Sequence, residues 1–222
     1  MSLTVLGSPL SPYVRKVTVS LRLKEVEFQL DHTVSPFSIP DGFEKLNPLK
    51  RIPVLKHEDR AIADSGVICR YLDSVFPQHK LSLDDPYLQS QVDWFEKFAD
   101  YELAPLLTFQ AFRLLLLFPV MQREVDTAQV HARLDKELPP LLNYLEEQIG
   151  DNDYLVGNQF TLADLAVVSQ FICYHYSGEQ IDRDRWPNLS RYLDYHFQSP
   201  VFAAILDKEL GLVAKMRAKA GL

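Results

Sequence analysis

A serine placed directly before a proline is the first feature of this 222-residue chain that could do chemistry. Ser is a preferred N-cap residue and Pro a preferred first helical residue, so Ser11-Pro12 predicts that a helix begins here. The unpaired N–H groups and the positive end of the helix dipole favour an anion at such a position. The Ser11 hydroxyl could donate a hydrogen bond to that anion, and a thiolate would benefit because the bond lowers its pKa. Taken alone, Ser11 is most simply a helix cap.

Two further groups of polar residues could bind charged parts of a small molecule. Asp64-Ser65 precedes a second apolar helical stretch. Ser65 with the first helix amides could hold a carboxylate, and Asp64 could accept from an ammonium group, so the pair suits an α-amino acid head. The cations of Lys50-Arg51 could hold a second carboxylate. The ordinary alternatives are a helix cap for the first pair and solvated loop charges for the second.

Ile52-Pro53 opens a predicted strand, and Pro is tolerated at the first position of a strand. A cis bond here would turn the Ile52 amide and carbonyl outward, where an extended peptide ligand could pair with them. Only about 5–6% of X–Pro bonds in folded proteins are cis, so base rates favour an ordinary trans bond.

The elements that must position these residues alternate along the first 80 residues. Apolar alternation predicts strands over 3–6, 26–30, 52–56 and 60–63, and helices are expected to begin at Ser11 and at Asp64. The order is β-α-β followed by β-β-α. This order indicates a small mixed sheet with helices.

The rest of the chain shows almost only helical periodicity. Residues 76–86 have a Pro near each end and are typical of a linker, which predicts domains over 1–80 and 86–222. Helices are expected from Asp85, over 125–149, from Thr161, and from Trp186 and Ser199. Pro139-Pro140 predicts a kink or an interruption in the second of these. Thr161 and Asp164 have capping-box spacing, and the apolar helix after them is expected to be the buried centre of its domain.

The net charge of the chain is −7, with 23 Lys and Arg against 30 Asp and Glu. Residues 1–80 carry +2 and residues 81–222 carry −9. An acidic total argues against nucleic acid as the main partner, and a mildly basic first part suggests a small anionic ligand there.

Other classes of protein find little support in the composition. The longest apolar run, residues 114–120, is too short to span a membrane. Two cysteines are too few for a disulfide framework, so Cys69 and Cys173 are interpreted as reduced thiols of a cytoplasmic protein. The sequence has no H-E-x-x-H, CxxC or Walker motif, and no metal cofactor is expected.

Five segments, in this order, resemble the cytosolic glutathione transferases over the whole chain: residues 7–16, 47–55, 64–65, 160–164 and 187–193. They are similar to the family's catalytic loop with its first helix, its cis-proline segment, its acidic-Ser pair, its capping motif and its late-helix signature. The resemblance implies an α+β fold: a thioredoxin-like N-terminal domain with a mixed four-stranded sheet, followed by an all-α C-terminal domain. It also implies glutathione as cosubstrate and a homodimer.

By position in the family's motifs, Ser11 would donate a hydrogen bond to the glutathione sulfur. Ile52 would pair its backbone with the cysteinyl part of glutathione, directly before cis-Pro53. Asp64 and Ser65 would hold the γ-glutamyl head.

Two positions complete this assignment. Lys50 lies where related enzymes place a His or Lys near the glycyl carboxylate. Ser8, three residues before Ser11, is an alternative hydrogen-bond donor to the sulfur. Ser11 is preferred because it directly precedes the helix.

Residues 11–14, Ser-Pro-Tyr-Val, also resemble the glutaredoxin C-P-Y-C stretch with both cysteines replaced. A mixed disulfide with the protein cannot form at Ser11, which argues against a thiol–disulfide reductase. The hypothesis is therefore a serine-type, bacterial-like transferase that activates the glutathione thiolate against a small hydrophobic electrophile, as in detoxification. The alternatives are a glutathione-dependent peroxidase or isomerase, and a catalytically weak binding module with the same fold.

Overall fold

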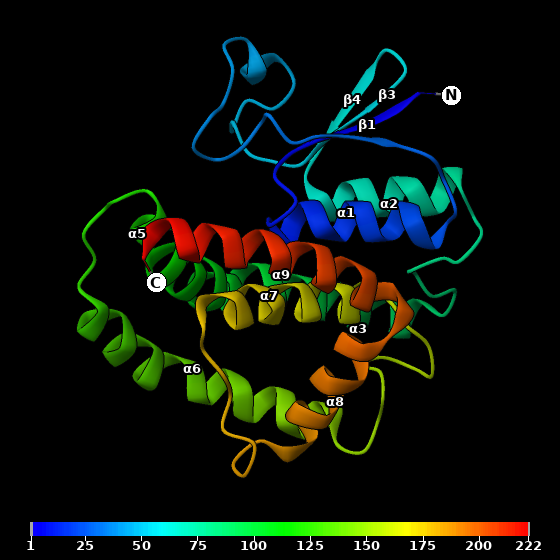
Figure 1. Ribbon diagram of the computed structural model, residues 1–222. Coiled ribbons are helices and arrows are strands. Elements are labelled where there is room, and N and C mark those ends of the chain that lie inside the picture. Colours follow the sequence, from blue (N-terminus) through cyan, green and yellow to red (C-terminus); the bar gives the residue numbers. More distant parts are fainter. Residues whose placement is uncertain (1, 222) are drawn as a thin grey trace. The chain divides into compact units, whose positions relative to one another are not determined.

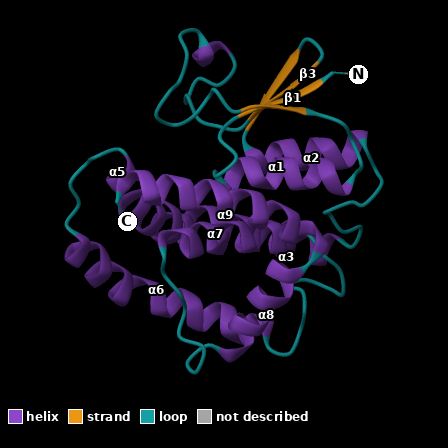
Figure 2. Cartoon of the chain, viewed as in Figure 1, coloured by secondary structure: helices purple, strands orange, loops and turns teal. Residues whose placement is uncertain are grey.

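Residues 2–221 are described by a computed structural model, in which the chain divides into two units, Met1–Gln89 and Ser90–Leu222 (Figure 1). The first unit contains both strands and helices, and the described part of the second contains helices without strands (Figure 2). This confirms the expected fold class, a mixed four-stranded sheet with helices followed by an all-α domain.

The sheet of the first unit has the order β2-β1-β3-β4. Its strands are β1 (Leu3–Leu6), β2 (Gln29–Asp31), β3 (Val54–His57) and β4 (Arg60–Ala63). The β1–β2 pair is parallel, whereas the β1–β3 and β3–β4 pairs are antiparallel. Helices α1 (Pro12–Leu23) and α2 (Ser65–Val75) run side by side along the sheet (Figure 1).

Burial explains how the sheet and these helices hold together. Val5 and Leu55 are fully buried in the two central strands, and Val17, Leu21 and Ile68 are fully buried on the two helices. Each fully buried aliphatic side chain contributes about 1.5–3 kcal/mol of transfer free energy. The apolar alternation and the helical periodicity of the sequence therefore correspond to one shared core.

Two of the expected strand boundaries are wrong. Residues 26–28 were expected in the second strand, but the Val26 amide donates to the Leu21 carbonyl and completes the end of α1, so β2 begins at Gln29. The third strand begins at Val54 instead of Ile52. Pro53 has no N–H to contribute to a ladder, and the pairing therefore starts after it.

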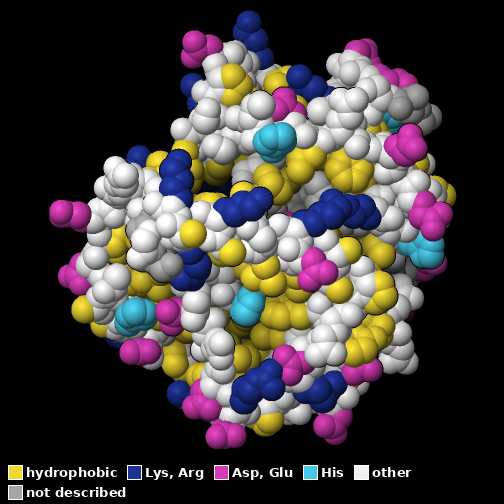
Figure 3. Space-filling model, in the orientation of Figure 1, with side chains coloured by type: hydrophobic (Ala, Val, Ile, Leu, Met, Phe, Trp, Pro, Cys, Tyr) yellow, Lys and Arg dark blue, Asp and Glu magenta, His cyan; other side chains and the backbone are white. Residues whose placement is uncertain are grey.

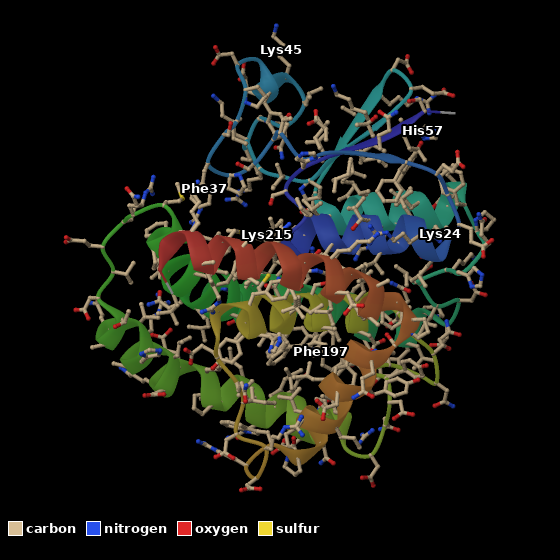
Figure 4. All side chains as sticks on the ribbon, viewed as in Figure 1. Lys24, Phe37, Lys45, His57, Phe197 and Lys215 are labelled. Atoms are coloured by element: carbon tan, nitrogen blue, oxygen red, sulfur yellow. The ribbon has the colours of Figure 1, made fainter. Side chains whose placement is uncertain are left out.

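A buried ion pair fixes the segment that follows α2. The Lys24 ammonium, at the end of α1, lies 2.7 Å from an Asp73 carboxylate oxygen, and the Lys24 side chain has no exposed area (Figure 4). The same ammonium donates to three backbone carbonyls within residues 76–79. Asp73 accepts from the amides of Leu81 and Ser82. Both charges are thus fully hydrogen-bonded, which is the condition under which burial of an ion pair is tolerated.

One long helical run crosses from the first unit into the second. It consists of α3 (Pro86–Phe98), a π-helical turn (Ala99–Leu103), α4 (Ala104–Leu106), a π-helical stretch (Leu107–Leu117) and α5 (Phe118–Val120). By length and composition alone this helix could cross a membrane: its most apolar 18 residues have a mean hydropathy of 1.7, and half of that window is buried inside the protein, as in a core helix. The run of residues 114–120 that was judged too short is the end of this longer element.

The remaining helices are α6 (Thr127–Ile149), α7 (Leu162–Ser177), α8 (Pro187–Gln198) and α9 (Pro200–Ala220). Of the 16 residues of α7, only His175 lies outside the buried class, so α7 is the expected centre of this unit. Pro139-Pro140 was expected to kink or interrupt α6, but the helix continues through both residues.

The capping box at the start of α7 is a fully buried network. The Asp164 carboxylate accepts from the Leu155 amide at 2.8 Å, from the Thr161 amide and hydroxyl at 2.9 and 3.0 Å, and from the Tyr192 hydroxyl at 3.0 Å. Burial raises the pKa of Asp164 to about 6, although these four donors act in the opposite direction. The box therefore also connects α7 to α8 and to the loop before it.

A buried histidine beside this network should make stability depend on pH. His196 is 1% exposed, its Nε2 lies 2.9 Å from the Asp153 carbonyl, and burial lowers its pKa to about 4. An unfolded His has a pKa of about 6.5, so the unfolded chain binds more protons between pH 4 and 6.5. This group's contribution is present above pH 6.5 and is lost as the pH falls to 4, an effect of roughly 3 kcal/mol.

We therefore expect the difference in unfolding free energy between the wild type and His196→Gln to shrink as the pH falls from 6.5 to 4. Urea titrations of both proteins at several pH values measure this difference. Asp164 titrates in the same window with the opposite sign, but its contribution is common to both proteins and cancels. A difference that does not change with pH would contradict the buried neutral imidazole.

Candidate functional site

The register of the sheet brings three of the predicted segments to one edge. Leu6 at the end of β1 pairs with Val54 at the start of β3, and Val54 pairs with Ala63 at the end of β4. Neighbouring strands are about 4.8 Å apart. The loop 7–11, Ile52-Pro53 and Asp64-Ser65 therefore leave the sheet side by side, at the same edge of three adjacent strands (Figure 1).

Gly7 allows the loop after β1 to lie close to its neighbours. Its φ angle is +154°, and its amide donates to the Asp31 carbonyl at 3.0 Å. A Cβ at this position would overlap Val14 Cγ2 and would lie 3.3 Å from Ile52 Cβ. Gly7 appeared in the sequence analysis only as part of a motif. Its steric role could not be predicted from the local sequence, because that role depends on contacts with Val14 and with the distant Ile52.

Ser11 is the N-cap of α1, as expected, and Pro12 is its first helical residue. The Ser11 Oγ accepts from the Val14 amide at 3.4 Å, and the Ser11 carbonyl accepts from the Arg15 amide at 2.9 Å. The side chain is half-buried. In accepting from Val14, the hydroxyl uses a lone pair and keeps its own proton available for donation.

Ser8, the alternative donor, lies in the turn before the helix. Its carbonyl accepts from the Ser11 amide at 3.1 Å, and its side chain is also half-buried. The two serines differ in one respect: Ser11 caps the helix and is hydrogen-bonded to a helix amide, so it lies at the positive end of the α1 dipole.

The Ile52–Pro53 peptide bond is cis. The Ile52 side chain is 8% exposed, and within residues 2–221 the Ile52 amide and carbonyl have no hydrogen-bond partner. Both groups are thus available for an extended ligand backbone at this edge.

Asn47 holds the loop before Pro53 and was missed as a positioning residue. It is 5% exposed; its Nδ2 donates to the Arg51 carbonyl at 2.8 Å, and its Oδ1 accepts from the Leu49 amide at 3.0 Å. The Asn-Pro dipeptide that opens the motif at 47–55 could have predicted this role, because Asn side chains commonly hydrogen-bond to the backbone of a turn.

Lys50 lies on this loop with a left-handed backbone, φ +52°, and an exposed side chain. Its ammonium is 3.6 Å from a Glu44 carboxylate oxygen, and both side chains are about half exposed. Such a pair contributes little, roughly 0–1 kcal/mol. The contact described for Lys50 is therefore with Glu44, and not with the residues at the sheet edge.

Asp64 is the N-cap of α2, where the sequence predicted that a helix begins. Its Oδ1 accepts from the Val67 amide at 3.1 Å, and its carbonyl accepts from the Ile68 amide at 2.9 Å. Ser65 is the first helical residue and is 3% exposed. In the described part of the chain, the amides of Ser65 and Gly66 have no partner, so they can bind an anion. Asp64 has φ +72°, a conformation that costs a non-glycine residue about 1–3 kcal/mol.

Two helix N-termini therefore start from one sheet edge, each with a hydroxyl in its first turn. Between them lies a backbone segment with an unpaired amide and carbonyl. This arrangement can bind a short, extended, peptide-like molecule with acidic groups.

Comparison with known proteins identifies the family. Residues 5–80 match the model of the glutathione S-transferase N-terminal domain, and residues 109–200 match that of the C-terminal domain. The chain belongs to the glutathione S-transferase family. Glutathione S-transferase 3 of Zea mays is 32% identical over 170 residues, which cover 73% of each chain.

Two solved structures share the fold of this glutathione S-transferase. A glutathione transferase homologue from Drosophila mojavensis with bound glutathione is 25% identical, with a TM-score of 0.79 over 98% of this chain and 97% of the other. A glutathione S-transferase from Methylobacterium radiotolerans, in complex with glutathione sulfonate, is 26% identical, with a TM-score of 0.75 over 93% and 95% of the two chains.

Replacement of Gly7 tests the close packing at the site. Gly7→Ala should lower the unfolding free energy by about 1–3 kcal/mol, because the new Cβ would overlap Val14 and forces the loop away from α1. Gly211→Ala is the matched control: nothing lies within 4 Å of its Cβ position, and Ala stabilises a helix interior by about 0.5–1 kcal/mol. Urea denaturation of both variants measures the change. Equal effects would show that Gly7 is not a tight contact.

Proposed function

We propose that this protein is a serine-type glutathione transferase, which binds glutathione at the sheet edge and uses its thiolate against a small hydrophobic electrophile. The observation that carries the proposal is the position of Ser11. Its hydroxyl accepts from the Val14 amide at the start of α1 and retains its proton for donation to a sulfur anion. The helix dipole favours the same anion.

The proposed binding mode gives each charged part of glutathione a partner. The amides of Ser65 and Gly66, with the Ser65 hydroxyl, hold the γ-glutamyl carboxylate at the N-terminus of α2. The Asp64 carboxylate accepts from the γ-glutamyl ammonium; only its Oδ1 is engaged by Val67. The Ile52 amide and carbonyl pair with the cysteinyl backbone next to Pro53, which directs the thiol toward α1.

Lys50 is proposed to attract the glycyl carboxylate. Its present contact with Glu44 is long and exposed, so it can be exchanged for a ligand at little cost.

The chemical step requires only that the glutathione thiol be deprotonated in its bound state. The thiol proton leaves to solvent, and the thiolate is stabilised by the Ser11 O–H and the end of α1. The sulfur then attacks an electrophilic carbon with its electron pair. A C–S bond forms, and the leaving group departs with the electrons of the bond that breaks. Ser11 lowers the energy of the anion and is not consumed.

Two glutathione-dependent reactions, peroxide reduction and isomerisation, would use the same thiolate and are the closest alternatives. A binding module with weak catalysis would keep the fold without turnover. A thiol–disulfide reductase is disfavoured, because Ser11 replaces the attacking cysteine and both Cys69 and Cys173 are free and buried.

Replacement of Ser11 tests the proposal. Ser11→Ala should remain bound to immobilised glutathione but lose about 100-fold in kcat/KM with 1-chloro-2,4-dinitrobenzene, as for the loss of one donor to a reacting anion. The pH profile of kcat/KM should move to higher pH, because the pKa of the bound thiol rises. Ser8→Ala is the matched control and should retain most of the activity.

The outcomes separate the candidates. Full activity in Ser11→Ala together with loss in Ser8→Ala would assign the role to Ser8. Retention of the wild type on glutathione without any turnover would favour the binding module. Failure of the wild type to bind glutathione would reject the proposal.

We also propose that the protein is a homodimer. Three aromatic residues on the long helix, Tyr87, Trp94 and Tyr101, are 71%, 50% and 65% exposed. Tyr87 and Trp94 are seven residues apart in α3 and share one helix face, and Tyr101 follows seven residues later in the π-helical turn. Aromatic side chains are enriched in the centres of protein interfaces, so this face is the proposed contact.

A charge on this face should dissociate the dimer. Trp94→Glu and Tyr101→Glu should each weaken dimerisation by at least about 30-fold, since central aromatic residues contribute 2 kcal/mol or more. Sedimentation velocity across a concentration series measures the change. Met121→Glu, at another exposed apolar side chain, is the control. A monomeric wild type, or dimers that persist in both variants, would contradict this interface.

The proposed setting is the cytoplasm. Both cysteines are free and buried, and free thiols are maintained in a reducing compartment that also contains glutathione.

A further inference from the structure

The helical unit has a cavity of about 410 Å³ that the proposed function does not use. It lies between the middle of α6, the end of α7 and the loop that leads to α8, and all its lining residues fall within 131–186. On the face of the molecule shown in Figure 3, hydrophobic side chains lie exposed between charged ones. Cavities of 300–1,000 Å³ are the usual size for small-molecule sites.

One side of the cavity is lined by apolar and aromatic side chains, and the rest of its lining is polar. Leu134, Leu138 and Leu142 follow one another at four-residue spacing along α6, and Tyr174 and Trp186 add ring surfaces. The Trp186 side chain is fixed, because its Nε1 donates to the Asn143 Oδ1 at 2.8 Å. Such walls suit the hydrocarbon or aromatic body of a ligand.

The charges at the cavity are predominantly negative. Asp135, Glu179 and Asp182 line it, against one guanidinium, that of Arg185. The Arg185 guanidinium lies over the Trp186 ring, 4.4 Å from its centroid. Glu179 is 3.1 Å from His131 Nε2 through one oxygen, and no ionic partner of Asp135 is found within residues 2–221.

A tyrosine side chain contributes an available hydroxyl to the same space. Tyr174 is 7% exposed and lines the cavity, and within the described chain its hydroxyl forms no hydrogen bond. The hydroxyl can therefore accept from or donate to a ligand in the cavity. Glu179 and Asp135 line the same cavity, and burial, followed by the charges of these two carboxylates, raises the pKa of Tyr174.

We propose that this cavity is a second ligand site, which binds an organic cation: a primary ammonium group attached to a small aromatic or aliphatic body. The ammonium donates to the Tyr174 hydroxyl oxygen and to the carboxylates of Asp135 and Glu179. The apolar body lies against the α6 leucines and the face of Trp186. A neutral molecule of the same shape lacks the charge, and an anion is repelled by three carboxylates.

The site is chemically opposite to the sheet edge of the first unit. That edge offers helix N-termini to acidic groups, whereas this cavity offers carboxylates to a base. The proposal therefore does not rest on the proposed transferase activity.

Three compounds of one shape and different charge test the site. 3-Phenylpropylamine is the probe, and 3-phenylpropanol and 3-phenylpropionate are its neutral and anionic counterparts. The chain contains two tryptophans, Trp94 and Trp186, so Trp94→Phe leaves the emission of Trp186 as the reporter. We expect saturable quenching by the amine, at least about tenfold weaker binding of the alcohol, and no saturation with the carboxylate.

Substitutions in the Trp94→Phe background locate the amine. Asp135→Asn, Glu179→Gln and Tyr174→Phe should each weaken its binding by about threefold to tenfold, the range for single exposed or half-buried polar contacts. Glu147→Gln is the matched control, because Glu147 is an exposed acid of α6 that does not line the cavity. Saturating glutathione should leave the amine affinity unchanged.

Several results would overturn the proposal. These are equal affinities for the three compounds, no effect of the Asp135 and Glu179 substitutions, no response of Trp186, or competition between the amine and glutathione. Competition would place the amine at the sheet edge instead. Turnover with 1-chloro-2,4-dinitrobenzene, measured in the same variants, keeps failure of this site distinguishable from failure of the transferase proposal.

Discussion

The candidate site depends on one steric contact, the approach of the loop after β1 to the first turn of α1. Gly7 lies against Val14 and Ile52, and no larger residue fits without displacing one of them. This contact sets the distance between the end of the strand and the start of the helix, and therefore where the helix N-terminus points. Since the proposed stabilisation of a thiolate acts over hydrogen-bond distances, a shift of 1 Å in this loop would remove most of it. The glycine matters because it has no side chain.

The local features of the site could be predicted from the sequence, and the contacts that assemble it could not. The Ser11 cap and the acidic cap before α2 are short-range patterns, in which side chain and amide are three residues apart. The alignment of Leu6, Val54 and Ala63 depends on strand register between segments almost 60 residues apart, and no local pattern encodes it.

The predicted interruption of α6 was wrong for a different reason. Pro139-Pro140 was expected to kink or interrupt a helix, yet α6 continues through both residues, and the long helix also includes Pro105 and Pro119. A proline removes one hydrogen bond, at a cost of about 3 kcal/mol in a helix interior. Burial of several leucines along the same element offsets this cost, and the π-helical stretches next to Pro105 show how the bond pattern adjusts. Local propensity is thus overridden wherever one element buries enough apolar surface.

The uneven charge of the chain can be compared with the chemistry of the two proposed ligand sites, the sheet edge and the cavity of the helical unit. The net charge of +2 over residues 1–80, which suggested a small anionic ligand, accompanies an edge at which two helices begin. The net charge of −9 over residues 81–222 comes mostly from solvated surface side chains. A buried acid such as Asp164 instead accepts hydrogen bonds that cap a helix. Asp135, Glu179 and Asp182 differ because they line a cavity together with three leucines and the Tyr174 side chain. A ligand bound against the apolar side of the cavity would displace water from around these carboxylates, and Coulomb interactions strengthen as the local dielectric falls.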